Sequence, residues 1–262
     1  MSTTENGGAI RLTNIIVKLD CCEFVNCIAQ AYGGAILLNK TKSNITNLYF
    51  HTCFVQEQKD QNFGNGCYIK DCESNCEMIS TQKCGPSADK CGDSTLVFQN
   101  NVTFLKKFNS TKSYPYLGAS GFTILYPLDG SSVSYILCSE SGDYTCAELF
   151  YISREFSFCN FINGPSLKSV FFVYQATLTI RNSVFANTTL KLSGGTGSVE
   201  LENCQSNIAY AGFQLDPFVG TIDFLVISSC NQNIECTSRP FDYYEVIIFR
   251  YWSFNYMYLF LT

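Results

Sequence analysis

The chain has 262 residues, 17 basic and 22 acidic side chains and a formal net charge of −5, and its charged residues make up 15% of the total, against about 25% in ordinary globular proteins. This scarcity of cations argues against a nucleic-acid-binding surface, which needs clustered basic residues. A single histidine, His51, excludes catalytic and zinc sites that need two imidazoles. The 15 cysteines, 18 glycines and 15% aromatic residues indicate a β-forming chain rich in turns.

The N-terminal segment repeats itself at a fixed interval of 26 in the numbering. The sequence GGAI at residues 7–10 recurs at residues 33–36, and FVNC at residues 24–27 is followed by FHTC at residues 50–53. Two landmarks that share one period indicate repeated structural units. Apolar and polar residues alternate within the units, as in residues 15–19, and this pattern predicts short strands with one buried face.

A run of cysteines follows the first two units. Five of them are closely spaced: Cys67, Cys72, Cys76, Cys84 and Cys91. Their neighbours are Gly, Ser, Asp and Lys, so we expect a loop excursion over residues 60–95 that is held by disulfides because it has little core. No C-x-x-C motif occurs, which favours disulfides over zinc, and the odd cysteine total leaves at least one thiol without a partner in the chain.

The repeat returns in the C-terminal half with less regular spacing. NCQSN at residues 203–207 is echoed by SCNQN at residues 229–233, again at an interval of 26, whereas FCNF at residues 158–161 and FANT at residues 185–188 lie 27 apart. We therefore expect one continuous repeat domain over residues 1–240, with units of variable length.

A unit of about 26 residues with two or three short strands predicts one turn of a solenoid, in which each turn stacks on the one before. Successive turns then pair in parallel at about 4.8 Å, and the handedness of parallel crossovers makes the winding right-handed. No stretch shows a sustained helical period. The sequence predicts an all-β fold, a right-handed parallel β-helix of the pectin-lyase-like kind.

Side chains separated by one full period are expected to lie at the same point of adjacent turns. Cys27 would then lie above Cys53, and Cys204 above Cys230, at a separation that permits either a disulfide or a stacked pair of thiols.

The turn residues follow the same logic. We expect Asn101, Asn207 and Asn233, which end F/C-x-x-N motifs, to occupy turns with left-handed dihedral angles. The two glycines before Ala9 and Ala35 indicate a tight corner with no room for a Cβ atom.

Five asparagines fit the N-x-S/T glycosylation pattern: Asn39, Asn44, Asn101, Asn109 and Asn187. With the cysteines, they favour a protein of the cell surface or one that is secreted. Residues 1–6 have neither a basic nor an apolar region of a signal peptide. We therefore expect the chain to be a fragment of a longer secreted protein, or one whose leader lies outside it.

The segment 241–262 is aromatic and aliphatic. Its longest charge-free piece, residues 251–262, has 12 residues, fewer than the roughly 20 that a helix needs to span a bilayer. We interpret the segment as a cap, a last strand or a truncated membrane-proximal piece. Membrane contact is expected only here, through Trp252 and the neighbouring tyrosines.

The repeated motifs resemble those of the chlamydial polymorphic outer membrane proteins, GGA followed by Ile, Leu or Val, and F-x-x-N. Similar repeats occur in large surface families of parasitic protists, notably trichomonads. The likeness rests on residues 7–10, residues 33–36 and Phe98 to Asn101, and it is good for residues 1–55. It implies a β-helical surface or secreted protein with an adhesive role and no catalytic residues to carry over. Nothing resembles an autotransporter barrel, and the cysteines and sequons favour the protist type.

We therefore expect a non-enzymatic structural or adhesive solenoid that uses no cofactor or metal. Its partner would be a host or matrix protein or a glycan, and its contact element the segment 67–91. His51 is interpreted as a strand or turn position, and the acidic residues of 89–93 as part of a disulfide-tied loop.

The alternative is a divergent carbohydrate-active β-helix, similar to a polysaccharide lyase or hydrolase. It would require carboxylates from successive turns to converge in one groove. The acidic residues are scattered along the sequence and include no adjacent aspartates.

Overall fold

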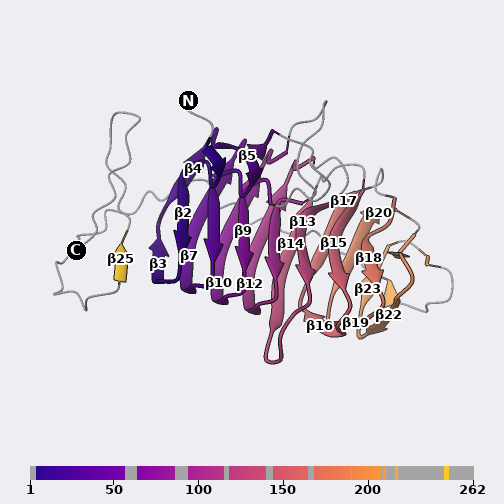
Figure 1. Cartoon of the computed structure of the whole chain (residues 1–262). Coiled ribbons are helices and arrows are strands. Elements are labelled where there is room, and N and C mark those ends of the chain that lie inside the picture. The colour runs from indigo at the N-terminus through magenta and orange to yellow at the C-terminus, as the bar shows by residue number, and fades with distance from the viewer. Residues whose placement is uncertain are drawn as a thin grey trace.

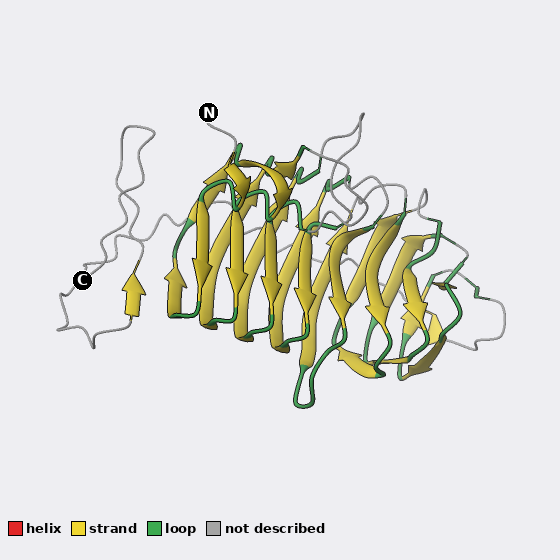
Figure 2. Ribbon diagram, viewed as in Figure 1, coloured by secondary structure: helices red, strands yellow, loops and turns green. Residues whose placement is uncertain are grey.

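Short strands follow one another along the chain, as the alternating sequence predicts (Figure 1). The structure is a computed structural model, and it describes residues 4–56, 64–85, 94–114, 118–139, 144–164, 168–189, 191–207, 209–210, 216–217 and 245–247. The regular elements in these ranges are all strands (Figure 2), and they pair in parallel. The predicted all-β parallel solenoid is confirmed.

The strands form three sheets that run along the solenoid. A three-stranded sheet contains β1 (Thr4–Asn6), β5 (Ile28–Tyr32) and β8 (Phe54–Val55). An eight-stranded sheet contains β2 (Ile10–Thr13), β6 (Ile36–Asn39), β9 (Cys67–Lys70), β11 (Leu96–Gln99), β13 (Ala119–Leu125), β15 (Thr145–Phe150), β18 (Phe171–Tyr174) and β21 (Ser193–Gly194). A fourteen-stranded sheet contains β3 (Ile16–Asp20), β4 (Glu23–Val25), β7 (Lys42–His51), β10 (Glu73–Gln82), β12 (Val102–Thr111), β14 (Ser132–Ser139), β16 (Arg154–Ser157), β17 (Asn160–Gly164), β19 (Thr177–Arg181), β20 (Val184–Thr188), β22 (Ser198–Glu202), β23 (Gln205–Ser206), β24 (Asp216–Pro217) and β25 (Glu245–Ile247).

Equivalent residues of successive turns form columns across the sheets. One column starts at Ile10 and continues through Ile36, Cys67, Leu96, Phe122, Ala147, Phe171 and Ser193. Seven steps thus cover 183 residues, an average of 26 per turn, and single steps range from 22 to 31. The 26-residue period is confirmed as an average, with elastic turn length.

Turn length in the first four turns varies in one connection. From the Ile10 column to the column of Cys27, Cys53, Cys84 and Ser113, the residue number advances by 17 in every turn. From that column back to the eight-stranded sheet, it advances by 9, 14 and 12 in turns one to three. The rest of the turn is therefore held at constant length.

The double-glycine motif forms the tight corner that the sequence predicts. Gly7 and Gly33 have φ of +65° and +59°, values that residues with a Cβ atom rarely adopt. A Cβ atom on the following glycine, Gly34, would lie 2.0 Å from the Asn65 carbonyl oxygen of the next turn. A third copy of the corner begins at Gly64, with φ of +71°. The sequence did not predict it, because the step from Ile36 to Cys67 is 31 residues and not 26.

Left-handed residues without glycine also lie in columns. A first left-handed column follows the eight-stranded sheet: Asn14, Lys40, Asp71, Asn100, Tyr126, Tyr151 and Gln175. A second lies at the bend inside the fourteen-stranded sheet: Cys21, Asn47, Met78, Lys107, Tyr135, Phe158, Asn182 and Asn203. A third precedes the Cys27 column: Asn26, Thr52, Lys83 and Lys112. The backbone conformation is thus a property of the column and not of the residue type.

The expectation for Asn101 is wrong by one position. Asn100 is the left-handed residue, with φ of +52°. Asn101 is buried, and its side chain accepts a hydrogen bond from the Cys72 amide at 2.7 Å and donates one to the Ile69 carbonyl at 3.0 Å. Asn207 is not among the left-handed residues either. Its side-chain Nδ2 atom donates to the Asn187 Oδ1 atom at 2.9 Å. Asn233 lies outside the described residues.

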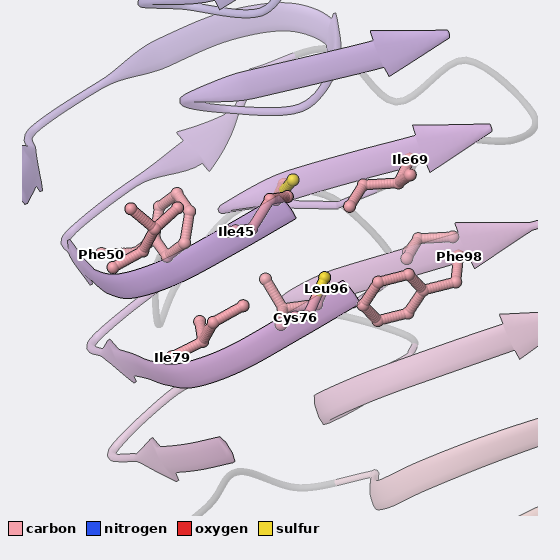
Figure 3. A pocket seen from close by; sticks show the side chains of 10 residues that line it. Ile45, Phe50, Ile69, Cys76, Ile79, Leu96 and Phe98 are labelled. Atoms are coloured by element: carbon pink, nitrogen blue, oxygen red, sulfur yellow. The ribbon is translucent and has the colours of Figure 1, made fainter. Parts of the chain in front are cut away.

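The interior between the sheets is apolar and closely packed. One continuous cluster of buried side chains extends from Ile10 to Tyr210. It contains nine phenylalanines: Phe24, Phe50, Phe98, Phe108, Phe122, Phe156, Phe161, Phe171 and Phe185. Figure 3 shows side chains of this cluster around an internal space of about 10 Å³, which is at the lower limit for one water molecule. This space cannot hold a ligand.

The predicted Cys-rich excursion is wrong for the part that the structure describes. Cys67 lies in β9 and Cys76 in β10, and Cys72 and Cys84 lie in the turns that end these strands. All four thiols are buried in the core, and in β10 the buried Cys76 follows the exposed Glu73 and Asn75 in the inward and outward alternation of the strand. Cysteine here acts as a small apolar side chain. Cys91 lies outside the described residues.

The segment 241–262 is described only at Glu245–Ile247, which forms β25 and pairs in parallel with β3 (Figure 1). The rest of the segment lies outside the described residues. In the part of the chain that the structure covers, no helix is long and apolar enough to cross a membrane.

Replacing Gly34 by alanine tests the corner. We expect Gly34→Ala to lower the free energy of unfolding by about 2 kcal/mol or more, because the new Cβ atom meets backbone that cannot move aside. Gly66→Ala is the matched control: it follows the same corner at the position that Ala9 and Ala35 occupy in earlier turns. Urea unfolding of both variants measures the difference, and equal losses would contradict the assignment.

Candidate functional site

Two stacked pairs of exposed aromatic residues are the most distinctive surface feature of the described chain. Tyr126 stacks on Tyr151 with ring centroids 4.3 Å apart and planes at 4°. Tyr135 stacks on Phe158 at 5.2 Å and 10°. Their exposed fractions range from 40% to 50%. We call these four residues the aromatic pairs.

The aromatic pairs occupy the first and second left-handed columns, with φ between +50° and +74°. At the same positions other turns carry Asn, Lys, Asp, Gln, Cys or Met. A bulky residue in this region is an outlier, and a left-handed residue with a Cβ atom costs roughly 1–2 kcal/mol. The left-handed turn directs each ring out from the solenoid. Such unfavourable positions are typical of functional surfaces.

The surroundings of the pairs combine apolar and polar groups. Tyr151 packs edge-on against Tyr174 at 5.5 Å, and the Tyr126 hydroxyl forms a hydrogen bond that raises the pKa of Tyr151. Leu128 and Ile152 add exposed apolar surface at 47% and 37%.

The loop that carries Leu128 extends beyond the neighbouring turns just before β14 (Figure 1). Arg154 holds it, because its Nη2 atom donates to the carbonyls of Pro127 and Leu128 at 2.9 and 2.8 Å. The Lys106 ammonium group lies 5.9 Å from the centroid of the Tyr135 ring. Charged groups therefore border the aromatic pairs.

The predicted thiol column is present at Cys27 and Cys53, which lie in adjacent turns with a hydrogen bond between their side chains. Cys204 instead shares a column with Ser183 and Cys159, and Cys230 lies outside the described residues. None of the described cysteines forms a disulfide. The disulfides expected among Cys67, Cys72, Cys76 and Cys84 are therefore absent, since these thiols fill separate interior positions.

Burial makes most of these thiols unreactive. It raises the pKa of Cys67 and Cys76 well above the ordinary value, and it raises the pKa of Cys159 to about 12. A thiol that stays protonated is a poor nucleophile and a poor metal ligand. In the residues that the structure describes, no group of three or more His, Cys, Asp or Glu side chains is placed to hold a metal ion.

The glycosylation candidates differ in exposure. Asn44 and Asn187 are exposed, and Asn39 and Asn109 are partly exposed. Asn101 is 1% exposed and uses its side chain in two hydrogen bonds to backbone. A glycan on Asn101 would have to displace this buried side chain, so we expect Asn101 to be the candidate that is not used.

Carboxylates meet at one place on the outer surface. Arg181 of β19 forms ion pairs with Glu155 of β16 at 3.1 Å and with Glu202 of β22 at 2.9 Å. The three side chains are 43% to 50% exposed, and Thr179 donates to nearby Glu200 at 3.3 Å. The guanidinium group lies between the two carboxylates and compensates one of their two negative charges. This arrangement is typical of a surface ion-pair ladder.

His51 and Glu148 each lie beside the hydroxyl group of a threonine. His51 ends β7, where its Nδ1 atom lies 3.1 Å from the Thr52 hydroxyl. Glu148 is buried on β15 and accepts a hydrogen bond from Thr123 at 2.7 Å. Its neighbours in the column are Thr123 and Phe172, so no second carboxylate flanks it in register.

Neither the aromatic pairs nor the ion pairs of Arg181 with Glu155 and Glu202 were predicted from the sequence. Tyr126 and Tyr151 lie about one period apart in the sequence, and Tyr135 and Phe158 are separated by a slightly shorter interval. The signal was present as aromatic residues at positions where a polar turn residue is usual, but recognising it requires the register of each turn.

Raising the pH is expected to destabilise the fold, since the unfolded chain releases thiol protons that the folded chain retains. Each buried thiol lowers the free energy of unfolding by about 1.4 kcal/mol per pH unit above an unfolded pKa near 8.5, until its higher folded pKa is reached. Urea titrations of reduced protein between pH 8 and 10 measure this slope. Cys76→Ala should remove the contribution of one thiol from this slope. An unchanged slope would contradict the assignment of Cys76 as a buried thiol with a raised pKa.

Comparison with known proteins gives no match: no family model, no curated protein and no solved structure is similar to this chain. The fold assignment therefore rests on the strand register and the packing described above.

Proposed function

We propose that the protein is a non-enzymatic solenoid of the cell surface or of a secreted protein, with an adhesive role, and that the aromatic pairs are its contact surface. The observation that carries this proposal is the placement of four large exposed rings at left-handed positions. Stacking within a pair stabilises adjacent turns by about 0.5–1.5 kcal/mol, but the turns do not need rings at these positions, since asparagine fits them in other turns.

The geometry favours a protein partner over a glycan. The rings of each pair face one another, so ring edges and phenol groups are presented to solvent. Edges and hydroxyls beside aliphatic groups and charges suit a protein interface, where tyrosine is enriched at the apolar centre and the rim is polar. A sugar that stacks on an aromatic ring needs an open ring face. The repeat motifs that resemble those of surface families also support an adhesive role.

Asparagine substitution separates binding from folding. We expect Tyr126→Asn with Tyr151→Asn, and Tyr135→Asn with Phe158→Asn, to weaken binding to cultured cells at least tenfold, the size expected for interface hot spots. Stability should change by less than about 1 kcal/mol, because asparagine tolerates the left-handed backbone. The control is Lys40→Asn with Lys107→Asn, which changes the same columns without removing a ring.

Cell binding by the fluorescently labelled chain would be measured by flow cytometry, after protease or glycosidase treatment of the cells. Loss after protease alone supports a protein partner. Loss after glycosidase alone identifies a glycan, and binding that all four substitutions leave unchanged would remove the aromatic pairs from the proposal.

The second candidate, a carbohydrate-active solenoid, has one observation in its favour: Glu155 and Glu202 flank Arg181 on the outer surface. We expect no release of reducing or unsaturated products from polyuronate or neutral polysaccharides. Product formation that Glu155→Gln abolishes would establish the second candidate and refute the first.

A surface location predicts which sequons are used. Expressed through a eukaryotic secretory route, the folded protein should carry glycans on exposed Asn44 and Asn187 and none on buried Asn101. Peptide mass mapping after enzymatic deglycosylation reads each site separately. Folded protein that carries a glycan at neither exposed site would argue against a surface or secreted location.

A further inference from the structure

The Cys27 column brings three thiols together across successive turns. Cys27, Cys53 and Cys84 each follow a residue of the third left-handed column. The Sγ atoms of Cys53 and Cys84 both point back toward the preceding turn, at 3.3 Å from the Phe24 carbonyl oxygen and 3.7 Å from the Phe50 carbonyl oxygen. The Phe54 amide donates to the Cys27 carbonyl at 3.0 Å, and the Gly85 amide donates to the Cys53 carbonyl at 3.0 Å. The column is therefore in register through its backbone as well.

The register places neighbouring cysteines at a distance that a disulfide can bridge. Parallel strands in register have Cα atoms about 4.8 Å apart, and disulfides join Cα atoms separated by about 4.4–6.8 Å. Cys53 can pair with Cys27 or with Cys84, but not with both. No disulfide is formed in the described part of this column.

The three thiols differ in access. Cys53 and Cys84 are both 0% exposed, whereas Cys27 is partly exposed at the first turn. A reagent from solvent therefore meets Cys27 first. Cys53 lies directly behind it, with its Sγ atom 3.3 Å from the Phe24 carbonyl oxygen of the preceding turn.

We propose that Cys27 and Cys53 form an oxidative modification site, in which Cys27 reacts with a peroxide and Cys53 then closes a disulfide between the first two turns. This site is independent of the proposed adhesive function. The pattern of an accessible thiol beside a resolving thiol is the one that reversible thiol oxidation requires.

The electrostatics support this order of events. The hydrogen bond from Cys53, acting against burial, lowers the pKa of Cys27. Burial and the hydrogen bonds with its neighbours raise the pKa of Cys53. The attacking thiolate is thus on the accessible side, and the proton donor is behind it.

The chemistry balances in two steps. The Cys27 thiol ionises, its thiolate attacks one oxygen of hydrogen peroxide, the O–O bond breaks, and a sulfenic acid and hydroxide form; the hydroxide takes up the proton that Cys27 released and becomes water. The Cys53 sulfur then attacks the Cys27 sulfur, the S–O bond breaks, and the hydroxyl group leaves as water with the Cys53 proton. Two thiols are oxidised, and one peroxide is reduced to two waters.

The test uses the reduced 262-residue chain, hydrogen peroxide and dimedone, with peptide mapping that reads every cysteine separately. We expect a Cys27–Cys53 disulfide in the wild type and a dimedone adduct on Cys27 in Cys53→Ser. Cys84→Ser should behave as wild type. Ser113 occupies the next position of the column, so serine preserves a hydrogen-bonding side chain there.

Cys27→Ser should slow the first oxidation at least tenfold. If its oxidation rate equals that of the wild type, or if Cys21, the other partly exposed cysteine among those described, is modified first in the wild type, the proposal is wrong. A measurement without mutation guards against misfolding: brief iodoacetamide treatment of the native chain should alkylate Cys27 faster than Cys53 and Cys84. Equal alkylation of the three would also overturn it.

Discussion

The hydrogen bonding between equivalent positions of successive turns is the constraint on which the rest of this structure depends. A turn that departs from the backbone path of its neighbour loses hydrogen bonds along its whole length. Residues as different as Lys40, Asp71 and Tyr126 therefore share a φ value near +50°. The hydrogen bonds to neighbouring turns therefore set the backbone conformation even where the residue type disfavours a positive φ. Glycine is needed where a neighbouring turn approaches the position of the Cβ atom, as at Gly34.

The sequence predicted the fold because two exact 26-residue repeats lie at its start, where Gly7 with Gly33 and Phe24 with Phe50 reveal the period. The prediction was wrong from Cys67 to Cys84, because the residue types there are typical both of loops and of small buried positions. Cysteine and serine suggested a loop, yet both are small enough to fill interior positions of a narrow solenoid. The 31-residue step also moved the third corner away from its expected place, and the identity of its central residue changed from glycine to Asn65.

The candidate site was harder to predict than the fold. The Cys27 and Cys53 column followed directly from the period, since the step from the first turn to the second is 26 residues both at Ile10 and at Ile28. The aromatic pairs did not, because their turns are shorter and the motifs there are degenerate. Aromatic content alone does not distinguish Phe156, buried in the core, from Phe158, which is exposed two residues later. The difference is the left-handed bend at Phe158, which reverses the alternation of inward and outward side chains.

The confinement of length variation to one connection has a consequence for how this surface can change. In the first four turns, residues can be gained or lost between the Cys27 column and the eight-stranded sheet without disturbing the hydrogen-bonded columns, because each return begins and ends at a fixed position. Loop closure becomes only slightly less favourable with each added residue. Each of these turns thus has a part of constant length, from the Ile10 column to the Cys27 column, and one connection that accepts insertions. Because these connections follow one another along the solenoid, binding sites acquired in them would be spaced by the stacking distance of the turns.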